Sequence, residues 1–335
     1  MNLEKNIVLS VVVPSYNIED YIERSILSFL EIDEKYQEMF EVIIVNDGSK
    51  DNTVEVAEEL IANHRFNNIK IINKENGGHG STINRGLLEA NGKYFKVIDG
   101  DDWVDKLAFE ELLTKLSKID YDMVITDYTE QYVLDNKVKL VQPIDIEVMN
   151  QVQTNIPNNR IPMHSITYKT SILRDNHIAL TEGVFYVDLQ YTLFPLNNIK
   201  TWIYYPLNVY QYLLGRANQS VNINSYIKNV SHHLIVLKSI LDFYDTIMTS
   251  PILEKVVGQT LKQLIDLQWI ISYLSDNNKE LLKDTYQVIE SSQYNYNLAE
   301  ARKISKLIYL EQKYPIIKIV STKVINKKLK SIYGK

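Results

Sequence analysis

The sequence predicts an α/β fold in which a Rossmann-like, mainly parallel sheet is followed by a helical region. Over the first 125 residues, short apolar runs alternate with helical patterns, as in stacked βαβ units. After Gly215 the apolar residues repeat at helical spacing instead. We therefore expect a sheet domain over residues 1–220, with halves 1–127 and 128–220, and a helical region over residues 221–335.

Apolar runs in the first half predict five strands, at Leu9–Val13, Val42–Val45, Ile69–Ile72, Tyr94–Ile98 and Met123–Ile125. Helices are expected between them, because apolar residues recur there every three or four positions. The helix after the second strand should begin at Asn52, with Glu55 three residues on, as in a capping box. A further helix is expected from about Ser81 to Ala90.

The pattern becomes irregular from Tyr128 to Leu214. A hairpin is expected around Asp135–Asn136, and strands near Trp202–Tyr205 and Val209–Leu213. Beyond Gly215, two apolar stripes at helical spacing predict helices that pack in a core. The stripes are Val230, Leu234, Leu237, Leu241 and Tyr244, then Val256, Leu264, Leu267, Ile271 and Leu274.

Composition limits the classes of function. A chain of 335 residues with 45% hydrophobic and 23% charged residues is typical of a globular protein with one large or two moderate domains. No apolar run reaches the roughly 20 residues of a membrane span, and the N-terminal run follows acidic Glu4 without a cleavage signal. We expect a cytoplasmic enzyme. Because cysteine is absent, any metal must bind to oxygen or imidazole.

Charge is unevenly distributed along the chain. The net charge of −6 argues against nucleic-acid binding, but residues 302–335 carry a net +9, which leaves −15 on the residues before them. Within this basic tail, apolar Ile316, Val320 and Val324 recur at four-residue spacing among lysines. Two interpretations stay open: peripheral docking at the inner face of an anionic membrane, or a helix packed on the body or on another subunit of a homo-oligomer.

Polar residues follow each of the first four strands. In open parallel sheets, ligands bind at the carboxyl ends of the strands. The segments at this edge are Pro14–Asn17, Asn46–Ser49, Asn73–Gly80 and Asp99–Asp102. Their succession predicts a binding site.

The segment Asp99–Asp102 contains three carboxylates within four residues. A hard divalent cation with oxygen ligands would offset the repulsion between them. The alternative is an acidic turn before the helix that follows Asp105. The position at a strand's carboxyl end favours the metal.

Two other segments at this edge allow more than one interpretation. Asp47 is predicted either to accept a hydrogen bond from a nucleobase or ribose or to form an Asx turn. Gly77, Gly78 and Gly80, with His79, precede a helix whose N-terminus favours phosphate. Neither G-x-G-x-x-G after the first strand nor a P-loop occurs, so dinucleotide redox cofactors and P-loop chemistry are disfavoured.

Four motifs in order resemble those of family 2 glycosyltransferases, which have the nucleotide-sugar-binding GT-A fold. They are Val11–Asn17 (VVVPSYN), Ile44–Ser49 (IVNDGS), Gly77–Gly86 (GGHGSTINRG) and Asp99–Trp103 (DGDDW), and the likeness covers about the first 215 residues. The Gln-x-x-Arg-Trp motif and membrane helices of processive members are absent, so a single addition is expected. Lys-, Asn-, Ile- and Tyr-rich usage is typical of a bacterial protein.

The resemblance implies a nucleotide-binding half at 1–127 and an acceptor-binding half at 128–220. It implies that Pro14, Tyr16 and Asp47 line the base pocket and that Asp99 lies near the ribose. Asp101, with Asp99, would hold Mn²⁺ or Mg²⁺ on the donor diphosphate. The remaining residues expected at the donor are Gly78, His79, Asn84 and Arg216. Arg216 would lie in a mobile loop that closes on the diphosphate, and the alternative is that it is simply a solvated loop charge.

The family also carries a catalytic carboxylate in a Glu-Asp pair before a helix. Here Val187 replaces the Glu and Asp188 remains, so the resemblance implies that Asp188 is the general base, with a helix N-cap as the alternative. His164 resembles positions near the acceptor, although a lone His is more often structural. A carboxylate base would take the proton of the attacking hydroxyl.

The expected activity is inverting, metal-dependent transfer of one sugar from a UDP-sugar to a glycan, glycopeptide or lipid-linked acceptor. The product would be a surface polysaccharide or a protein-linked glycan. Because Val187 departs from the family pattern, the alternative is a catalytically silent nucleotide-sugar-binding partner subunit. A sugar-phosphate nucleotidyltransferase would need a glycine-rich, basic loop after the first strand, and Pro14–Asn17 supplies none.

Overall fold

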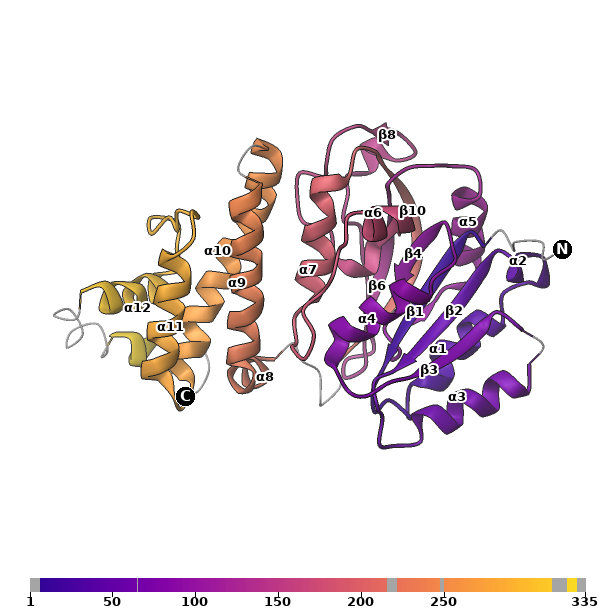
Figure 1. Ribbon diagram of the computed structural model, residues 1–335, viewed down its shortest axis with the longest axis horizontal. Helices are drawn as coiled ribbons and strands as arrows, with labels where there is room; N and C mark the ends of the chain where they lie inside the picture. The colour runs from indigo at the N-terminus through magenta and orange to yellow at the C-terminus, as the bar shows by residue number, and fades with distance from the viewer. Residues whose placement is uncertain (1–6, 65, 216–221, 248–249, 315–323, 330–335) are drawn as a thin grey trace. The chain divides into compact units, whose positions relative to one another are not determined.

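The computed structural model describes residues 7–64, 66–215, 222–247, 250–314 and 324–329. The chain divides into two compact units, Met1–Asn218 and Gln219–Lys335. In Figure 1 the first unit holds the sheet, coloured indigo to pink, and the second consists of helices, coloured orange to yellow. The predicted fold class, an α/β domain followed by a helical region, is confirmed.

Four parallel strands form the first half of the sheet, in the order β3-β2-β1-β4. Every residue of β1, β2 and β4 is buried, which explains why these strands appear as uninterrupted apolar runs rather than as alternating patterns. The strands are β1 (Leu9–Ser15), β2 (Phe40–Asn46), β3 (Ile69–Asn73) and β4 (Tyr94–Val97).

Helices cover both faces of these strands. The faces of β1 and β2 that include Val11 and Val42 join the same core as Phe29 of α1 and Phe109 of α5. Phe109 meets Phe29 edge-on at 5.8 Å between ring centroids. On the opposite face, α4 packs so tightly on β1 that a Cβ at Gly86 would collide with Val12. The helices are α1 (Ile22–Leu30), α2 (Glu34–Gln37), α3 (Thr53–Ala62), α4 (Gly78–Glu89) and α5 (Lys106–Leu116).

The predicted capping box at α3 does not form. Asn52 is the N-cap residue but makes no capping bond, because its side chain donates to Glu19. Asp51 supplies the local acceptor instead and receives the backbone N–H and the hydroxyl of Thr53.

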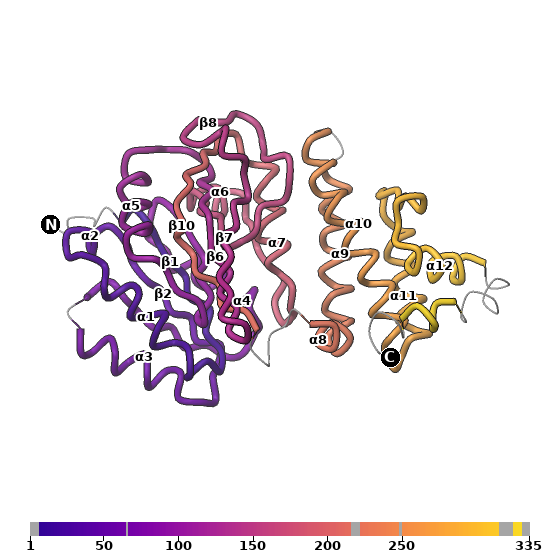
Figure 2. The backbone as a smooth tube through the Cα atoms, turned by 180° about the vertical axis from the view of Figure 1, so that it is seen from behind, coloured from indigo at the N-terminus to yellow at the C-terminus, as the bar shows by residue number. Residues whose placement is uncertain are grey.

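The second half of the sheet is mixed. Strand β9 runs antiparallel between β4 and β6, whereas β6 and β10 run parallel to each other. Figure 2 shows β6 beside its neighbours β7 and β10. The hairpin expected at Asp135–Asn136 joins β6 to β7, with Asn136 in the left-handed region at φ 49°. The strands are β5 (Trp103–Val104), β6 (Met123–Tyr132), β7 (Lys137–Val141), β8 (Val152–Gln153), β9 (Ile166–Lys169) and β10 (Trp202–Leu214).

Short helical segments fill the connections of this half. Three are 3₁₀ turns and two are short α-helices, of which α7 begins with Asp188. The 3₁₀ turns are Ile146–Val148, Met163–Ser165 and Phe194–Asn198, and the helices are α6 (Thr170–Asp175) and α7 (Asp188–Leu193).

The C-terminal unit has its own core with buried polar groups. His233 of α9 bonds Gln268 of α10 at 2.6 Å, and Gln268 donates to Ser272 at 2.8 Å. All ten residues of the two predicted stripes lie in α9 and α10, and both helices bury an apolar face. The helices are α8 (Ile223–Lys228), α9 (Val230–Thr246), α10 (Pro251–Leu274), α11 (Asn278–Glu290) and α12 (Lys303–Lys313).

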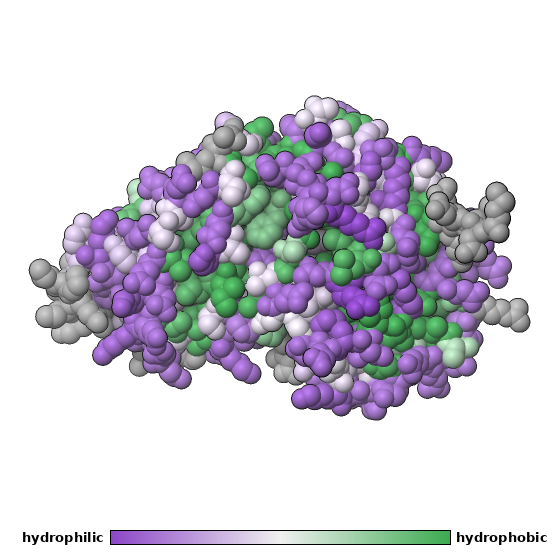
Figure 3. All heavy atoms as spheres, in the orientation of Figure 1, coloured by the Kyte–Doolittle hydropathy of each residue, from purple (hydrophilic) through white to green (hydrophobic). Residues whose placement is uncertain are grey.

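The basic tail is only partly covered by the structure. Ile316 and Val320 lie outside the described residues, and 324–329 are helical. Val324 is 43% exposed, whereas Ile325 and Leu329 are buried. Among the described helices, none is both long and apolar enough to span a bilayer. On the face shown in Figure 3, hydrophilic side chains cover most of the surface, with apolar side chains in smaller areas between them.

Candidate active site

The carboxyl ends of the parallel strands are bonded to one another through their backbones. The carbonyl of Pro14, the last residue but one of β1, accepts from Gly100 N at 3.0 Å, and that of Ser15 accepts from Asp47 N at 2.9 Å. Lys74 N in turn donates to Asn46 O at 3.0 Å. The turns after β1, β2, β3 and β4 therefore form one continuous edge, as the order of the strands requires.

Asp47 is the buried centre of this edge. Its carboxylate accepts from the backbone N–H groups of Gly77 and Gly78 at 2.9 and 2.8 Å and from Lys74 Nζ at 2.7 Å. These amides belong to the N-terminus of α4, where the helix dipole favours an anion. In this structure Asp47 is that anion, so it links β2 to α4.

His79 and Asp99 form an ion pair across the edge, with 2.8 Å between Nε2 and Oδ1. Burial lowers the pKa of His79, but Asp99, Asp188 and Asp47 together outweigh it, so that the net pKa is raised. His79 thus places a cationic or proton-donating ring among three carboxylates.

Asp102 is held by two donors from β10. Tyr210 donates its hydroxyl to Oδ2 at 2.5 Å, and Leu213 donates its backbone N–H to Oδ1 at 2.8 Å. Burial, followed by the charge of Asp99, raises the pKa of Asp102 well above its ordinary value. The neighbouring Asp101 is half-buried, and its backbone carbonyl lies 3.4 Å from the Arg24 guanidinium.

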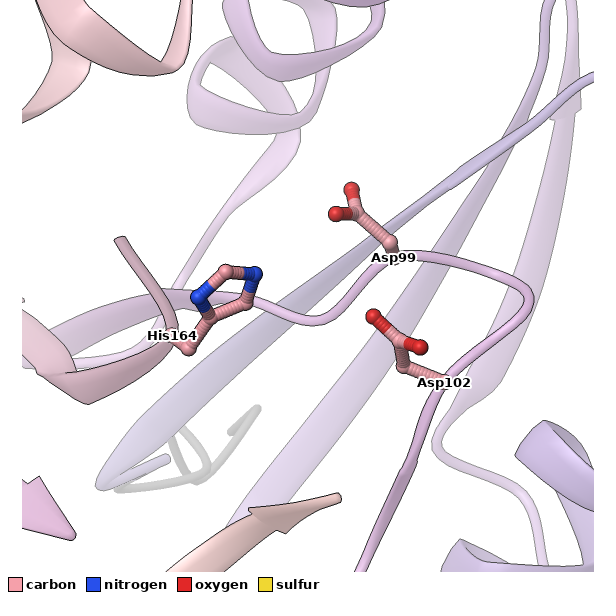
Figure 4. A group of neighbouring side chains, drawn as sticks. All are labelled: Asp99, Asp102 and His164. Carbon is pink, nitrogen blue, oxygen red and sulfur yellow. The ribbon is translucent and has the colours of Figure 1, made fainter. Parts of the chain in front are cut away.

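One group of ligand atoms in the described part of the chain could hold a metal ion. Oxygens of Asp99 and Asp102 and a ring nitrogen of His164 lie within 4.8 Å of one another (Figure 4). Carboxylate oxygen and neutral imidazole are donors that Mn²⁺ accepts, and each Asp102 oxygen keeps a second lone pair beside its protein hydrogen bond. The residues present therefore fit a divalent cation. Asp101 is not a member of this group.

His164 lies among tyrosine rings. It stacks on Tyr212 at 4.2 Å and meets Tyr128 and Tyr210 at 5.0 and 4.8 Å between centroids. Burial lowers the pKa of His164 to about 4, so the ring is neutral near pH 7. Lys96, fully buried in β4, fixes this segment by donating to His164 O at 2.8 Å and Ile166 O at 3.2 Å.

Asp188 is the first residue of α7 and does not cap it; the N-cap is Val187, without a side-chain bond. Burial raises the pKa of Asp188, with Arg160 and His79 acting against the shift and Asp99 adding to it. Asp188 therefore interacts electrostatically with residues of the donor edge, although it is 89 residues away from Asp99 in sequence. A carboxylate whose pKa is raised in this way is a stronger proton acceptor than an ordinary aspartate.

A loop between α6 and α7 connects Asp188 to the glycine-rich turn. Asn84 of α4 donates to Leu180 O at 2.9 Å and to Glu182 Oε1 at 3.0 Å, and it accepts from Leu180 N at 2.9 Å. Gly183 N donates to Gly77 O at 2.5 Å. Gly78 has φ 80°, a conformation in which a side chain would be strained. The Asn84 side chain and the Gly77 carbonyl thus hold this loop against the N-terminal part of α4.

The remaining predicted donor-site residues are Pro14, Tyr16 and Arg216. Pro14 is buried in β1, and Tyr16 is 45% exposed at the same edge. Arg216 lies outside the described residues.

Sequence reasoning did not find Lys96 or the link between Tyr210 and Asp102. A charged residue within the apolar run Tyr94–Ile98 was the available signal for Lys96. For Tyr210 the partner is 108 residues away, and no local pattern points to it.

The sheet order and the carboxylate-lined strand edge are those of the nucleotide-sugar-binding GT-A fold. Residues 10–180 match the model of glycosyl transferase family 2, which is just over half of the 335 residues. The chain therefore belongs to glycosyl transferase family 2.

Among curated relatives, the uncharacterised glycosyltransferase MG060 homolog of Mycoplasma pneumoniae is 28% identical over 70% of this chain and 77% of its own length. The uncharacterised glycosyltransferase EpsJ of Bacillus subtilis is 35% identical over 37% of this chain, a match that spans 34% of EpsJ.

Solved structures share the fold at low identity. TarS 1–349 of S. aureus covers 98% of this chain and 93% of its own with a TM-score of 0.64 and 18% identity, and TarS was also solved with UDP-GlcNAc. The mannosyltransferase PcManGT of Pyrobaculum calidifontis, in complex with GDP-Man and Mn²⁺, covers 94% of this chain and 86% of its own at 14% identity, with a TM-score of 0.54.

Proposed function

We propose that this glycosyltransferase transfers one sugar from a UDP-sugar to an acceptor hydroxyl with inversion, and that Asp188 is the general base. The observation that carries the proposal is the position of Asp188 beside the donor edge, in the electrostatic range of His79 and Asp99. Attack of a hydroxyl on the face of the sugar opposite the nucleotide needs a proton acceptor on that side, and a placed carboxylate contributes about 10²–10⁴-fold.

The donor nucleotide is proposed to bind along the edge formed by residues 1–127. Pro14, Tyr16 and Asp47 would border the base, and Asp99 the ribose. His79 would face the diphosphate, with Gly78 and Asn84 supporting that turn and Arg216 closing over it. UDP-GlcNAc in TarS and GDP-Man in PcManGT support a nucleotide-sugar at this edge. We propose that the nucleotide of this chain's donor is UDP.

A divalent cation, Mn²⁺ or Mg²⁺, is proposed at Asp101 and Asp99. When bound it would neutralise charge on the leaving nucleotide. Mn²⁺ in PcManGT supports a divalent cation at this edge, and the group of metal-ligating atoms supports Asp99 as one of its ligands, although that group holds Asp102 and His164 rather than Asp101. Asp102 holds the backbone of the same turn through Tyr210 and Leu213.

The acceptor is proposed to bind over residues 128–220, near His164 and Asp188, as a glycan, glycopeptide or lipid-linked sugar. The product would be a surface polysaccharide or a protein-linked glycan, made by single additions in the bacterial cytoplasm. Residues 221–335 are proposed either to dock peripherally on a membrane surface or to contact a second copy of this chain in a homo-oligomer.

The test is slow hydrolysis of a panel of UDP-sugars with Mn²⁺ by the purified chain. Asp188→Asn should lower turnover at least about 100-fold, because the amide cannot accept the proton. Asp135→Asn, on the exposed tip of the β6–β7 hairpin, is the matched control and should keep full turnover. Equal turnover by Asp188→Asn and the parent chain would refute the assignment of the base.

A second candidate is a catalytically silent nucleotide-sugar-binding partner subunit, which the Val187 substitution in the family's Glu-Asp pair favours. Thermal shifts with UDP-sugars, measured beside turnover of the same sugars, separate the two candidates. A ligand at about 100 times its dissociation constant stabilises by about 2.7 kcal/mol whether or not it reacts. Stabilisation without any turnover would support the partner subunit.

The basic tail is tested by liposome flotation. If the tail docks on anionic lipid, the full chain should float with phosphatidylglycerol vesicles, and truncation after Leu310 should abolish this, since each basic residue near such a surface contributes about 1 kcal/mol. Unchanged flotation after truncation would leave packing on the body or on a second copy.

A further inference from the structure

Tyr212 of β10 has a hydroxyl that makes no hydrogen bond within the part of the chain that the structure describes. Its side chain is half-buried, and its ring stacks on His164 at 4.2 Å between centroids with 27° between the planes. Tyr210, two residues earlier on the same strand, donates its own hydroxyl to Asp102. The stack therefore fixes the Tyr212 ring, while its O–H group is left for a ligand.

The surroundings of this ring place it near both functional parts of the site. Its centroid lies 6.5 Å from that of Tyr210, whose hydroxyl bonds Asp102. The 3₁₀ turn on which Tyr212 stacks, Met163–Ser165, packs against β10 and also against α7, the helix that begins with Asp188. Tyr212 thus adjoins the acidic turn after β4 and the segment that packs on α7.

The charges around Tyr212 keep its hydroxyl protonated. Burial raises the pKa of Tyr212, and the charges of Asp102, Asp99 and Asp188 raise it further. One phenol is therefore in electrostatic range of carboxylates at the donor edge and of the proposed base. Near neutral pH Tyr212 is a neutral hydrogen-bond donor, and it cannot itself act as a base.

An inverting displacement fixes what lies between these carboxylates. The leaving diphosphate is proposed on the side of Asp99 and the base is Asp188, so the anomeric carbon of the transferred sugar must lie between them for in-line attack. A sugar hydroxyl both donates and accepts, so it can accept from Tyr212 and donate to a carboxylate at once. A phosphate oxygen only accepts, and the carboxylate charges repel it.

We propose that the Tyr212 hydroxyl donates a hydrogen bond to a hydroxyl of the sugar that is transferred, and that Tyr212 takes part in selecting the donor sugar. This inference rests on the proposed function and adds a residue that recognises the sugar part of the donor. Because the stack on His164 holds the ring, the O–H group is oriented before the sugar binds. A sugar without a hydroxyl at the contacted position leaves the phenol unpaired and binds more weakly.

Isothermal titration calorimetry of the full chain with Mn²⁺ present measures this contact. The probes are UDP, UDP-glucose, UDP-galactose, UDP-N-acetylglucosamine and UDP-N-acetylgalactosamine. Tyr212→Phe removes the hydroxyl and keeps the ring on His164. For the UDP-sugar that the parent chain binds most tightly, this substitution should weaken the affinity about five- to tenfold, because one hydrogen bond is lost, and it should leave the affinity for UDP unchanged.

Monodeoxy analogues of that UDP-sugar separate the contact from a structural effect of the substitution. When each hydroxyl of the sugar is removed in turn, the parent chain should lose affinity by a similar factor for the analogue that lacks the contacted hydroxyl. Tyr212→Phe should bind this analogue and the complete UDP-sugar equally, because the partner of the missing hydroxyl is absent as well.

Tyr36→Phe is the matched control. It removes a half-buried tyrosine's hydroxyl from α2, which directly precedes the amino end of β2, and it should bind every probe as the parent chain does. Thermal melting of each variant checks folding. Unchanged affinity of Tyr212→Phe for the UDP-sugar, an equal loss for UDP, or an equal loss in Tyr36→Phe would overturn the contact alone. Absence of UDP-sugar binding by the parent chain would overturn the proposed donor together with it.

Discussion

Asp102 is a carboxylate that is 1% exposed, yet it is close to a second carboxylate, Asp99. Burial and that charge both raise the pKa of Asp102. Two protein donors, Tyr210 and the Leu213 backbone, offset the loss of water at its oxygens. Tyr210 also accepts from Asp99 N at 3.2 Å, so one hydroxyl connects both ends of the turn.

Tyr210→Phe should therefore lower the free energy of unfolding by roughly 1–3 kcal/mol, since one oxygen of a buried carboxylate loses its donor. Urea unfolding of the full chain measures this loss. Tyr212→Phe is the control, because Tyr212 contacts His164 through its ring and phenylalanine keeps that stack. Equal stabilities of the two variants would show that the hydroxyl of Tyr210 carries no net stabilisation.

The metal ligands can be separated by single substitutions. Asp99 belongs to both ligand sets considered, whereas Asp101 belongs to the proposed one and His164 to the group of Figure 4. We expect Asp99→Asn and Asp101→Asn each to weaken Mn²⁺ binding at least about tenfold in the presence of UDP, and His164→Asn to change it little. Isothermal titration with Mn²⁺ provides the measurement. If His164→Asn weakened Mn²⁺ binding and Asp101→Asn did not, the ligand set would be that of Figure 4, which includes the imidazole of His164.

Individual residues differ in how far the sequence predicts their place. Asp47 and Asp99 were predictable at one edge, because parallel strands deliver their carboxyl ends there. Their partners were not: the acceptors that Lys96 contacts are carbonyls in a segment about 70 residues away. Such contacts depend on tertiary packing, which leaves no local periodicity.

At the scale of elements, α4 and the loop before α7 contact each other closely at glycine residues. A Cβ at Gly80 would collide with the backbone carbonyl of Thr181. Gly77 accepts from Gly183 N in the same contact. Because α4 carries His79 and the loop precedes Asp188, this contact sets how the two halves of the site are spaced.

Gly80→Ala should force these backbones apart. We expect a loss of roughly 1–3 kcal/mol of stability from overpacking and a fall in donor turnover, because Asp188 shifts with the loop. Thermal unfolding and UDP-sugar hydrolysis measure the two effects. Gly258→Ala is the matched control: it lies within α10, and the nearest atom to its added Cβ is at 3.5 Å, so it should stabilise by about 0.5–1 kcal/mol. Loss of stability in both variants alike would contradict this account.

Elements were predictable to the extent that their burial is uniform. Strands β1, β2 and β4 are buried throughout and appear as apolar runs, whereas β3 is buried only at Ile69. The two strands expected at Trp202–Tyr205 and Val209–Leu213 are one strand, β10, interrupted by register shifts between Tyr205 and Tyr210. Polar Asn208 within that irregular stretch divides the apolar pattern. The antiparallel β9 has only four residues, too few for a period to show.

At the scale of the whole molecule, each unit carries a buried neutral histidine. His233 has its pKa lowered to about 4 by burial, with Gln268 acting weakly against the shift. His164 has the same direction and the same cause in the sheet unit. Between about pH 4 and the ordinary value of 6.5, the unfolded chain binds these protons and the folded chain does not.

Stability should therefore fall as the pH is lowered through this window. For His233 the contribution is fully present above pH 6.5 and declines towards pH 4, by roughly 3 kcal/mol in total. Urea unfolding of the full chain at pH 8, 6.5, 5 and 4 tests this. Trp269, fully buried in the C-terminal unit, reports on that unit alone in a Trp103→Phe, Trp202→Phe background.

His233→Gln keeps a polar partner for Gln268 but has no proton to bind, so it should flatten the decline reported by Trp269. His64→Gln, at the surface of the sheet unit, serves as the control and should leave the decline unchanged. Carboxylates protonate equally in all three proteins, so their effect cancels in the comparison. A decline of the same slope in His233→Gln would mean that acid destabilises this unit through its carboxylates and not through the buried imidazole.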